Sequence, residues 1–386
     1  MSSMNPRRIC FFTGKRGGFT HFVPLLERIG ADPALEYSVV ACDMHLMQLF
    51  GETIGEVEDW SRNVYTLETA LGSDSRRARA KSVGLVVLGA AELLEQIKPE
   101  LVLVLGDRGE ALGMTIAAVE LNIPVAHLFG GDVCQGGVDE PVRHAITKLA
   151  SVHLASNRQS ADRIVRMGEE PWRVHTVGAP ALDLIARKQY TPAVEICRRF
   201  QLDPDKPILV LLQHSVSWQV EDAGAQIRET LRALDELEYQ TVAIYPCSDP
   251  GYQAVIAGLE ERRARPWMRL QPHVPFADFW GLLSVAGAFV GNSSAGVIET
   301  PSFGLPFVNV GIRQRDRLRA DNVIDAPHEK DAIVRAIRTA LFDDGVRERA
   351  RRCESPYGDG HAAGRIVEIL KSVTLGDRLI QKRLAY

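Results

Sequence analysis

Three features are scarce in this chain of 386 residues, and each scarcity argues against a class of protein. No apolar run approaches the roughly 20 residues that cross a bilayer, so we expect no membrane association. There is no long basic run and the net charge is −4, so we expect no nucleic-acid partner. The cysteines are scattered and form no CxxC pair, which favours a reducing cytoplasm over a disulfide framework. They are Cys10, Cys42, Cys134, Cys197, Cys247 and Cys353.

Motifs for metals and common cofactors are missing as well. No set of histidines, cysteines and carboxylates has the spacing of a metal site, so we expect no metal. The glycine-rich segments match neither GxGxxG nor a Walker A loop. We expect no bound cofactor.

What the chain does have is a regular alternation of apolar strands and helical patterns, as in 85–97 and 223–237. Nearly continuous apolar strands that alternate with helices predict parallel sheets covered on both faces. The predicted strands are 8–14, 36–42, 101–107, 123–129, 151–156, 174–178, 207–213, 240–246, 286–291 and 306–311.

The rhythm is interrupted once, near 180–206, by Gly178-Ala-Pro180, a charged helix and Asp203-Pro-Asp-Lys-Pro207. Two Rossmann-like α/β domains that face each other across a cleft are the simplest architecture. We place them at 1–182 and 183–360, with a C-terminal helix at 361–386 packing back on the first domain.

The stretch 101–149 carries the densest set of reactive side chains. Two apolar strands each end in a glycine-flanked acidic turn that opens a helix. Ligands of open parallel sheets bind at the carboxyl ends of strands, so this arrangement suits proton transfer on a phosphorylated ligand. Helix N-capping is the structural alternative for Asp107 and Asp139. The residues in the turns are Asp107, Arg108, Glu110, Asp132, Asp139 and Glu140.

Two further loops suit a nucleotide. Gly14-Lys15-Arg16-Gly17-Gly18 follows the first strand, and it is either a phosphate contact or a tight turn with two solvated cations. Residues 290–299 repeat this form in the second half. There Asn292–Ser294 can cap a helix, Gly296 and Glu299 fall in its first turns, and Glu299 could accept both ribose hydroxyls. The alternative is an ordinary capped helix, but Arg313 after the next strand favours a nucleotide.

Two histidines, His45 and His214, also follow predicted strands, one in each half of the chain. A lone histidine is usually structural, but a position after a strand faces the expected ligand edge. Both are therefore candidates for the site.

Taken in order, several motifs resemble one family. They are GDRGEAL (106–112), GGDVCQGGVDEPVRHAITKL (130–149), QHSVS (213–217), HVPFADF (273–279), GNSSAGVIETPSFGLPFVNVGIRQ (291–314) and YGDGHAAGRIVEIL (357–370). Over nearly the whole chain the sequence resembles the hydrolysing UDP-N-acetylglucosamine 2-epimerases of sialic-acid-type pathways. The resemblance implies a GT-B-like fold with UDP held mainly by the second domain.

The resemblance also implies roles for individual residues. Asp107 and Asp139 match the catalytic aspartates, Asp132 matches a further acid, and His214 and His45 line the sugar site. The residues that it assigns to UDP are Arg16, Arg108, Ser293, Ser294, Gly296, Glu299 and Arg313, and Lys15 lies in the same loop as Arg16.

Three departures from the family pattern fall on the sugar side. Phe129 stands where the family has a glutamate, and the loop 132–138 is one residue longer. Lys15-Arg16-Gly17-Gly18 replaces a Thr-Arg-Ala-Glu type of loop, and Cys247 replaces an asparagine. An apolar Phe129 would tolerate a 6-deoxy or acetamido group better than a carboxylate would.

The sequence therefore predicts a hydrolysing nucleotide-sugar 2-epimerase. It would convert a UDP-linked N-acetylglucosamine or 2,4-diacetamido-2,4,6-trideoxyglucose to the free manno sugar plus UDP, through a glycal, in sialic-acid-like or legionaminic-acid synthesis. We expect a homodimer or homotetramer. The alternatives are a glycosyltransferase of the same fold, which would need an acceptor to release UDP, and a non-catalytic nucleotide-sugar binder.

Overall fold

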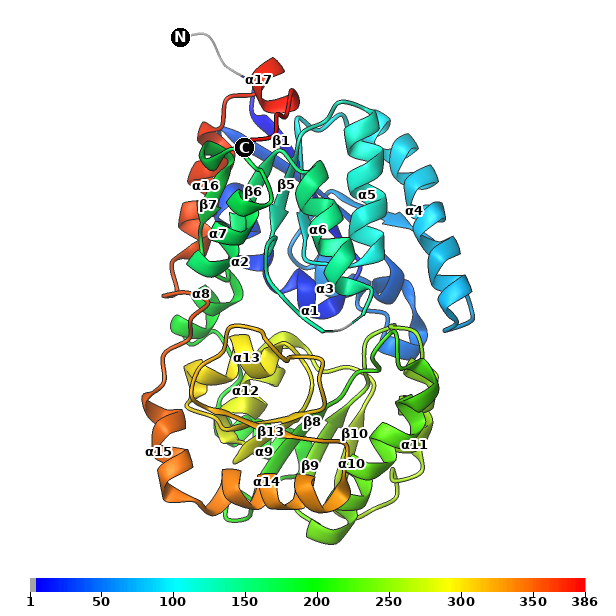
Figure 1. Cartoon of the computed structure of the whole chain (residues 1–386), viewed down its shortest axis with the longest axis vertical. Coiled ribbons are helices and arrows are strands. Elements are labelled where there is room, and N and C mark those ends of the chain that lie inside the picture. Colours follow the sequence, from blue (N-terminus) through cyan, green and yellow to red (C-terminus); the bar gives the residue numbers. More distant parts are fainter. Residues whose placement is uncertain (1–4, 136, 386) are drawn as a thin grey trace. The chain divides into compact units, whose positions relative to one another are not determined.

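The computed structural model describes residues 5–135 and 137–385 and divides the chain into two compact units (Figure 1). Unit 1 comprises Met1–Val133, Val138–Leu184 and Tyr357–Tyr386. Unit 2 comprises Cys134–Gly137 and Ile185–Pro356. None of the helices in the described part of the chain combines the length and apolar composition that a bilayer crossing needs.

Unit 1 is built on a seven-stranded parallel sheet with the order β3-β2-β1-β4-β5-β6-β7. Its core includes the apolar faces of β1, β4 and β5 and of the helices α4 and α5. The strands are β1 (Arg7–Thr13), β2 (Leu35–Cys42), β3 (Val64–Leu67), β4 (Leu101–Leu105), β5 (Val125–Leu128), β6 (Val152–Ala155) and β7 (Val174–Thr176). The main helices are α1 (Arg16–Phe19), α2 (Val23–Gly30), α3 (Ile54–Glu58), α4 (Arg76–Ile97), α5 (Gly109–Glu120), α6 (Asp139–Leu149), α7 (Arg158–Arg166), α8 (Ala181–Ala186), α16 (Ala362–Ser372) and α17 (Asp377–Ile380).

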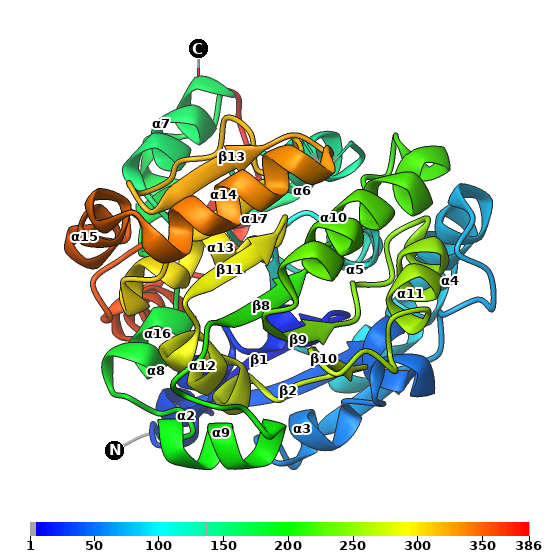
Figure 2. The same ribbon diagram turned by 90° about the horizontal axis from the view of Figure 1, so that it is seen from below.

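Unit 2 is built on a six-stranded parallel sheet with the order β10-β9-β8-β11-β12-β13. Figure 2 shows α10, α11 and α14 over one face of this sheet and α9 and α12 over the other. The strands are β8 (Ile208–Leu212), β9 (Gln240–Ile244), β10 (Met268–Gln271), β11 (Ala288–Gly291), β12 (Phe307–Val310) and β13 (Val323–Ala326). The helices are α9 (Ala193–Phe200), α10 (Ala223–Leu237), α11 (Tyr252–Glu260), α12 (Phe276–Val285), α13 (Ala295–Ile298), α14 (Lys330–Phe342) and α15 (Asp344–Arg352).

The predicted α/β class with two parallel sheets is confirmed, and all ten predicted strands are present. Three strands were missed: β3, β10 and β13. Each lies at the edge of its sheet, and each carries partly exposed side chains. An edge strand is covered less completely than a central one, so its sequence lacks the continuous apolar run that identified the others.

Each sheet reverses its strand order at one place, and this places the ligand edge. In unit 1 the reversal lies between β1 and β4, and in unit 2 between β8 and β11. A crevice opens at the carboxyl ends of the two strands that flank such a reversal. The loops after β1 and β4, and those after β8 and β11, are therefore the expected ligand-binding loops of the two units.

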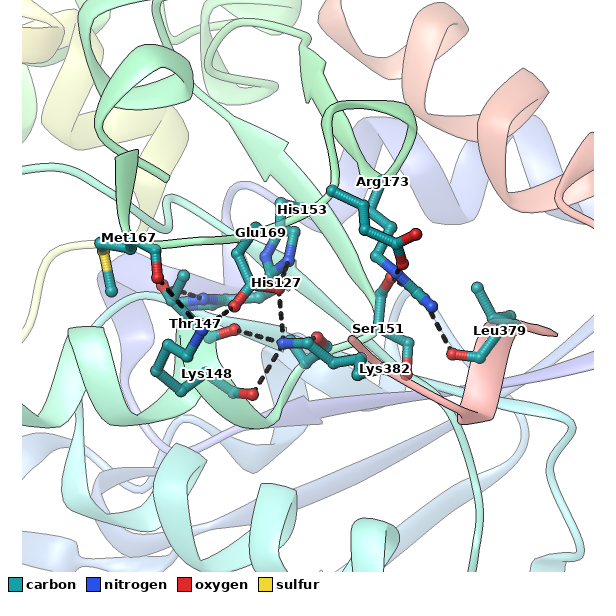
Figure 3. Close-up of polar contacts among 12 residues, drawn as sticks. His127, Thr147, Lys148, Ser151, His153, Met167, Glu169, Arg173, Leu379 and Lys382 are labelled. Carbon is teal, nitrogen blue, oxygen red and sulfur yellow. Dashed lines mark hydrogen bonds and ion pairs between the residues drawn. The ribbon is translucent and has the colours of Figure 1, made fainter. Parts of the chain in front are cut away.

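The end of the chain belongs to unit 1, where it covers a buried charged cluster (Figure 3). Lys382 Nζ lies 2.6 Å from Glu169 Oε2, and it donates to the carbonyls of Thr147, Lys148 and Ala150 at 3.2, 2.7 and 2.8 Å. These carbonyls lie at the C-terminal end of α6, where no further turn of helix provides donors. Lys382 therefore caps α6 and neutralises a carboxylate whose side chain is fully buried.

We expect Lys382→Met to lower the free energy of unfolding by about 2–3 kcal/mol, because it leaves buried carbonyls and part of the Glu169 charge uncompensated. Urea denaturation measures the loss. Lys371→Met is the matched control: this lysine pairs with Asp32 at 2.6 Å on the surface, where solvent screens the pair. Equal losses for the two variants would contradict a capping role for Lys382.

Candidate functional site

In unit 1, most of the predicted site residues follow the strands at the carboxyl edge of the sheet. Lys15 and Arg16 follow β1, His45 follows β2, Asp107 and Arg108 follow β4, and Asp132 and Asp139 follow β5. We describe this edge and the corresponding edge of unit 2 separately.

The two predicted catalytic aspartates of unit 1 come together. A carboxylate oxygen of Asp107 and one of Asp139 lie within 4.8 Å of each other. Arg108 bridges them: its Nε lies 3.8 Å from Asp107 Oδ1 and its Nη1 lies 3.7 Å from Asp139 Oδ1. The Asp139 side chain is 8% exposed and that of Asp107 is 20% exposed. Two carboxylates beside a cation can exchange a proton with a ligand at this edge.

Arg143 completes this group, and the sequence analysis did not select it. Its guanidinium pairs with Asp107, and Nη1 donates to the Phe129 carbonyl at 3.1 Å. The side chain is 1% exposed. A signal was present in the sequence, because Asp139 and Arg143 are four residues apart on one helix and so share a face.

Neither aspartate is a helix N-cap. The helix α5 has Arg108 at its N-cap position, and α6 begins at Asp139 after Val138. In neither helix does the N-cap side chain form a capping hydrogen bond. The simplest structural alternative for Asp107 and Asp139 is therefore wrong, and both carboxylates face arginines instead.

The glycine-rich loop after β1 is tied into a buried ionic network. Lys15 Nζ lies 3.0 Å from Asp43 Oδ2 and 4.0 Å from Glu110 Oε1, and Arg79 pairs with both carboxylates. A Cβ atom at Gly14 would lie 2.6 Å from Glu110 Cγ. In this structure, the glycine makes room for Glu110 and the lysine charge is met by protein carboxylates. Arg16, at the start of α1, is half-buried.

His45 is buried, and both of its ring nitrogens contact threonine hydroxyls. Nε2 lies 2.9 Å from Thr13 Oγ1, and Nδ1 lies 2.9 Å from Thr53 Oγ1. With 1% of its surface exposed, His45 can reach a sugar only by exchanging one of these bonds. The geometry makes His45 a support for the loop after β2.

At the end of β5, the departure from the family pattern is a buried aromatic ring. Phe129 is 4% exposed, has a φ of 65° and packs edge-to-face on His21 with ring centroids 4.8 Å apart. Left-handed backbone in a bulky residue is costly, and functional sites often retain such strain. Asp132 is also buried, and its Oδ1 accepts from the Val133 N–H at 2.9 Å.

In unit 2, His214 follows β8 and is joined to the loop after β11. Its backbone N–H donates to Asn292 Oδ1 at 2.6 Å, and Asn292 Nδ2 donates to the His214 carbonyl at 2.9 Å. The imidazole Nδ1 accepts from the Cys247 N–H at 3.0 Å. In a neutral imidazole, this contact leaves the proton on Nε2, so that nitrogen can donate.

The nucleotide loop of unit 2 differs in detail from the prediction. The helix α13 has only four residues, and Glu299 follows its last residue instead of lying in its first turns. A Cβ at Gly296 would lie 2.5 Å from the ring of Phe307, so this glycine allows α13 to pack on β12.

The other predicted residues of this loop are largely buried. Arg313 is 8% exposed, and its Nη1 donates to the Asn292 carbonyl at 3.1 Å. Ser293 is buried, and its Oγ accepts from Ala295 N at 3.4 Å, while Ser294 is half-buried at the N-cap position.

Glu299 has the most perturbed carboxylate near this loop. Burial raises its pKa to about 7, although a hydrogen bond from Trp280 Nε1 at 2.7 Å opposes the shift. An acid with this pKa exchanges its proton near neutral pH, and it is readily charged by a partner that donates hydrogen bonds. A ribose diol is such a partner.

Comparison with known proteins identifies a family that the chain matches along most of its length. The family model described as UDP-N-acetylglucosamine 2-epimerase matches residues 27–371. A Legionella pneumophila protein named UDP-N,N'-diacetylbacillosamine 2-epimerase (hydrolyzing) is 35% identical over 98% of this chain and 100% of its own. A Neisseria meningitidis UDP-N-acetylglucosamine 2-epimerase is 31% identical over 86% of this chain and 87% of its own.

Solved structures show the same fold. The crystal structure of UDP-GlcNAc 2-epimerase from Neisseria meningitidis bound to UDP-GlcNAc has a TM-score of 0.80 at 18% identity, covering 94% of this chain and 99% of that one. The Methanocaldococcus jannaschii enzyme in complex with UDP-GlcNAc and UDP has a TM-score of 0.77 at 16% identity, with the same two coverages.

Proposed function

Because the chain belongs to the UDP-N-acetylglucosamine 2-epimerase family and is a hydrolysing UDP-N-acetylhexosamine 2-epimerase, we propose that its preferred sugar is 2,4-diacetamido-2,4,6-trideoxyglucose. The observation that carries this choice is the match to the Legionella relative along almost the whole of both chains. The enzyme would then serve legionaminic-acid-type synthesis, and we expect it to work as a homo-oligomer.

The proposed reaction has two stages. In an α-linked gluco sugar, the C1 leaving oxygen and the C2 hydrogen are trans-diaxial. A base removes the C2 proton, the electron pair forms the C1–C2 double bond, and the C1–O bond breaks to release UDP. Water then adds its oxygen to C1 of the glycal while an acid protonates C2 from the other face. The product is the free manno sugar, so the step needs two groups that exchange acid and base roles.

We assign the acid–base work at the unit 1 edge to Asp107 and Asp139, because their carboxylates share one small volume with Arg108 and Arg143. The arginines stabilise the negative charge of the carboxylates, and they do not give up their own protons. Asp132 and His214 are the further candidates for proton transfer. The Cys247 N–H bond to Nδ1 supports this role for His214, because it fixes the orientation of the imidazole ring.

We assign the nucleotide to the loop after β11 and its neighbours. Glu299 would accept the ribose hydroxyls, and Ser293, Ser294 and Gly296 would face the diphosphate, as would Arg313. At the unit 1 edge, Arg16 and Arg108 would offer positive charge to a phosphate group and His45 would support the sugar. Lys15 would act indirectly, because Asp43 and Glu110 meet its charge. A cationic and N–H-rich setting for the leaving diphosphate is what an elimination of this kind needs.

Phe129 supports the substrate choice. A carboxylate at the end of β5 would demand a hydrogen-bonding partner, whereas the buried Phe129 ring, which packs on His21, needs none. A sugar with a methyl group at C6 and a second acetamido group presents more apolar surface than N-acetylglucosamine does.

The test compares both UDP-sugars in an assay of UDP release and in proton NMR in D2O. We expect kcat/KM to be at least about tenfold higher for the diacetamido sugar, the scale that one apolar group supplies in a fitted pocket. Deuterium should appear at C2 of the manno product, with no acceptor other than water. UDP release without deuterium at C2 would contradict the elimination, and equal kcat/KM values would contradict the choice of sugar.

A further inference from the structure

A buried polar bridge lies under the catalytic edge of unit 1, and none of its members belongs to the proposed acid–base group. The bridge is formed by His127 on β5 with Gly106, which follows β4, and Thr147 on α6. His127 Nε2 lies 2.7 Å from the Gly106 carbonyl oxygen, and Nδ1 lies 3.3 Å from Thr147 Oγ1. His127 has no exposed surface.

The chemistry of the bridge defines its protonation state. A carbonyl only accepts hydrogen bonds, so Nε2 must carry the proton and Nδ1 must accept from the Thr147 hydroxyl. Burial lowers the pKa of His127 to about 3, so the ring stays neutral in this tautomer near neutral pH. His127 is thus a fixed spacer and does not transfer protons.

The bridge joins the two elements that carry the aspartates. Gly106 immediately precedes Asp107, and its own N–H donates to the Leu128 carbonyl at 2.8 Å. Thr147 lies on α6, the helix that begins at Asp139 and carries Arg143. The turn that bears Asp107 is therefore held to β5 through both the N–H and the carbonyl of Gly106, and β5 is held to α6.

The backbone at Gly130 packs closely against the bridge. A Cβ atom at Gly130 would lie 2.8 Å from His127 Nδ1 and 3.1 Å from Thr147 Oγ1. The backbone after β5 thus passes directly against the bridge, which only a glycine permits. The bridge is enclosed on this side by the segment that leads from Phe129 to Asp132.

We propose that His127 is a positioning residue for the 2-epimerase reaction, which sets the separation of the Asp107 and Asp139 carboxylates by locking the Gly106 turn to α6. This inference rests on the proposed roles of the two aspartates. Loss of the lock should misplace the proton transfers without removing any group that binds UDP. A displacement of about 1 Å in a catalytic group can cost about 10²-fold in rate.

A neighbouring histidine provides a matched control. His153 on β6 pairs with His127 in the strand register and is equally buried, but its Nε2 contacts Glu169 Oε2 at 3.0 Å (Figure 3). Glu169 also contacts Lys148 and Lys382, so His153 supports the charged cluster at the C-terminal end of α6. Replacing either ring by phenylalanine removes the same chemical groups at similar burial.

The experiment uses the full chain with His127→Phe, His127→Gln, Thr147→Val and His153→Phe, and measures kcat, KM, UDP affinity, Tm and the fraction of glycal released. We expect His127→Phe to lower kcat about 10- to 100-fold, with KM and UDP affinity changed less than about threefold. Glutamine can donate to the Gly106 carbonyl, so His127→Gln should recover most of kcat. Thr147→Val should give a smaller loss and release more glycal than wild type.

Three results would overturn the proposal. One is a wild-type kcat in Thr147→Val, a measurement that remains available if His127→Phe does not fold. The second is a parallel fall of kcat and Tm in His127→Phe and His153→Phe. The third is a rise in the KM of His127→Phe with kcat unchanged. A wild-type enzyme that releases no UDP from either sugar would instead refute the proposed function, so the two failures are distinguishable.

Discussion

Asp107→Asn and Asp139→Asn should each lower kcat by about 10²-fold or more, because each removes a group that takes or gives a proton during the reaction. The amide keeps the size of the side chain, so the geometry of the edge should persist. We expect the double variant to lose much less than the product of the single losses, since the two carboxylates act as one unit beside Arg108. Turnover of both UDP-sugars and deuterium at C2 measure the effect.

The control for this experiment is Asp183→Asn. Asp183 is also a buried carboxylate of unit 1, but it accepts from the backbone N–H groups of Ala362 and Ala363 at the start of α16. We expect this variant to lose stability while kcat stays near the wild-type value. Near-wild-type turnover in both Asp107→Asn and Asp139→Asn would refute their catalytic assignment.

Glu299→Gln should weaken binding of a UDP-sugar by about 10²-fold. Two ribose hydroxyls that donate to one carboxylate form charge-assisted hydrogen bonds, worth together about 3 kcal/mol, and the neutral amide loses much of that energy. Isothermal titration calorimetry on the Asp107→Asn background measures the affinity while turnover is slowed. An unchanged affinity would remove Glu299 from the nucleotide site.

The pH dependence of UDP-sugar binding provides a second test of Glu299. Burial raises the pKa of Glu299 to about 7 in the free protein, and bound hydroxyls favour the carboxylate, so its pKa falls in the complex. Affinity for a UDP-sugar should therefore rise with pH up to about 7 and level off above it, and it should fall as the solution is acidified. Glu299→Gln should abolish this dependence. A UDP-sugar is preferable to UDP as the probe, because its diphosphate diester does not titrate in this range.

Residue patterns alone determined the strand–helix alternation and the polar residues after each central strand. Central parallel strands are covered on both faces, so their apolar runs are continuous and visible in sequence. The edge strands β3, β10 and β13 were invisible because exposure breaks such runs. The family was also readable, since its motifs keep their order along the chain, and the comparisons confirm it.

Tertiary structure decided what each selected side chain does. Gly14 and Lys15 look like a phosphate loop in sequence, but Glu110 and Asp43 approach them from other elements. Gly296 lets α13 pack against the Phe307 ring on β12, a contact that no local pattern reveals. Local sequence sets propensity and spacing, whereas these partners are brought in by strand order.

The same reasoning explains Arg143 and His127, which the sequence analysis passed over. Their neighbours Asp107, Gly106 and Thr147 are 20 or more residues away along the chain, so only folding brings donor and acceptor within bonding distance. The sequence determined that carboxylates would gather at one sheet edge. The tertiary structure decided which cations and spacers hold them there, because hydrogen bonds and ion pairs depend on distances in space that residue spacing does not encode.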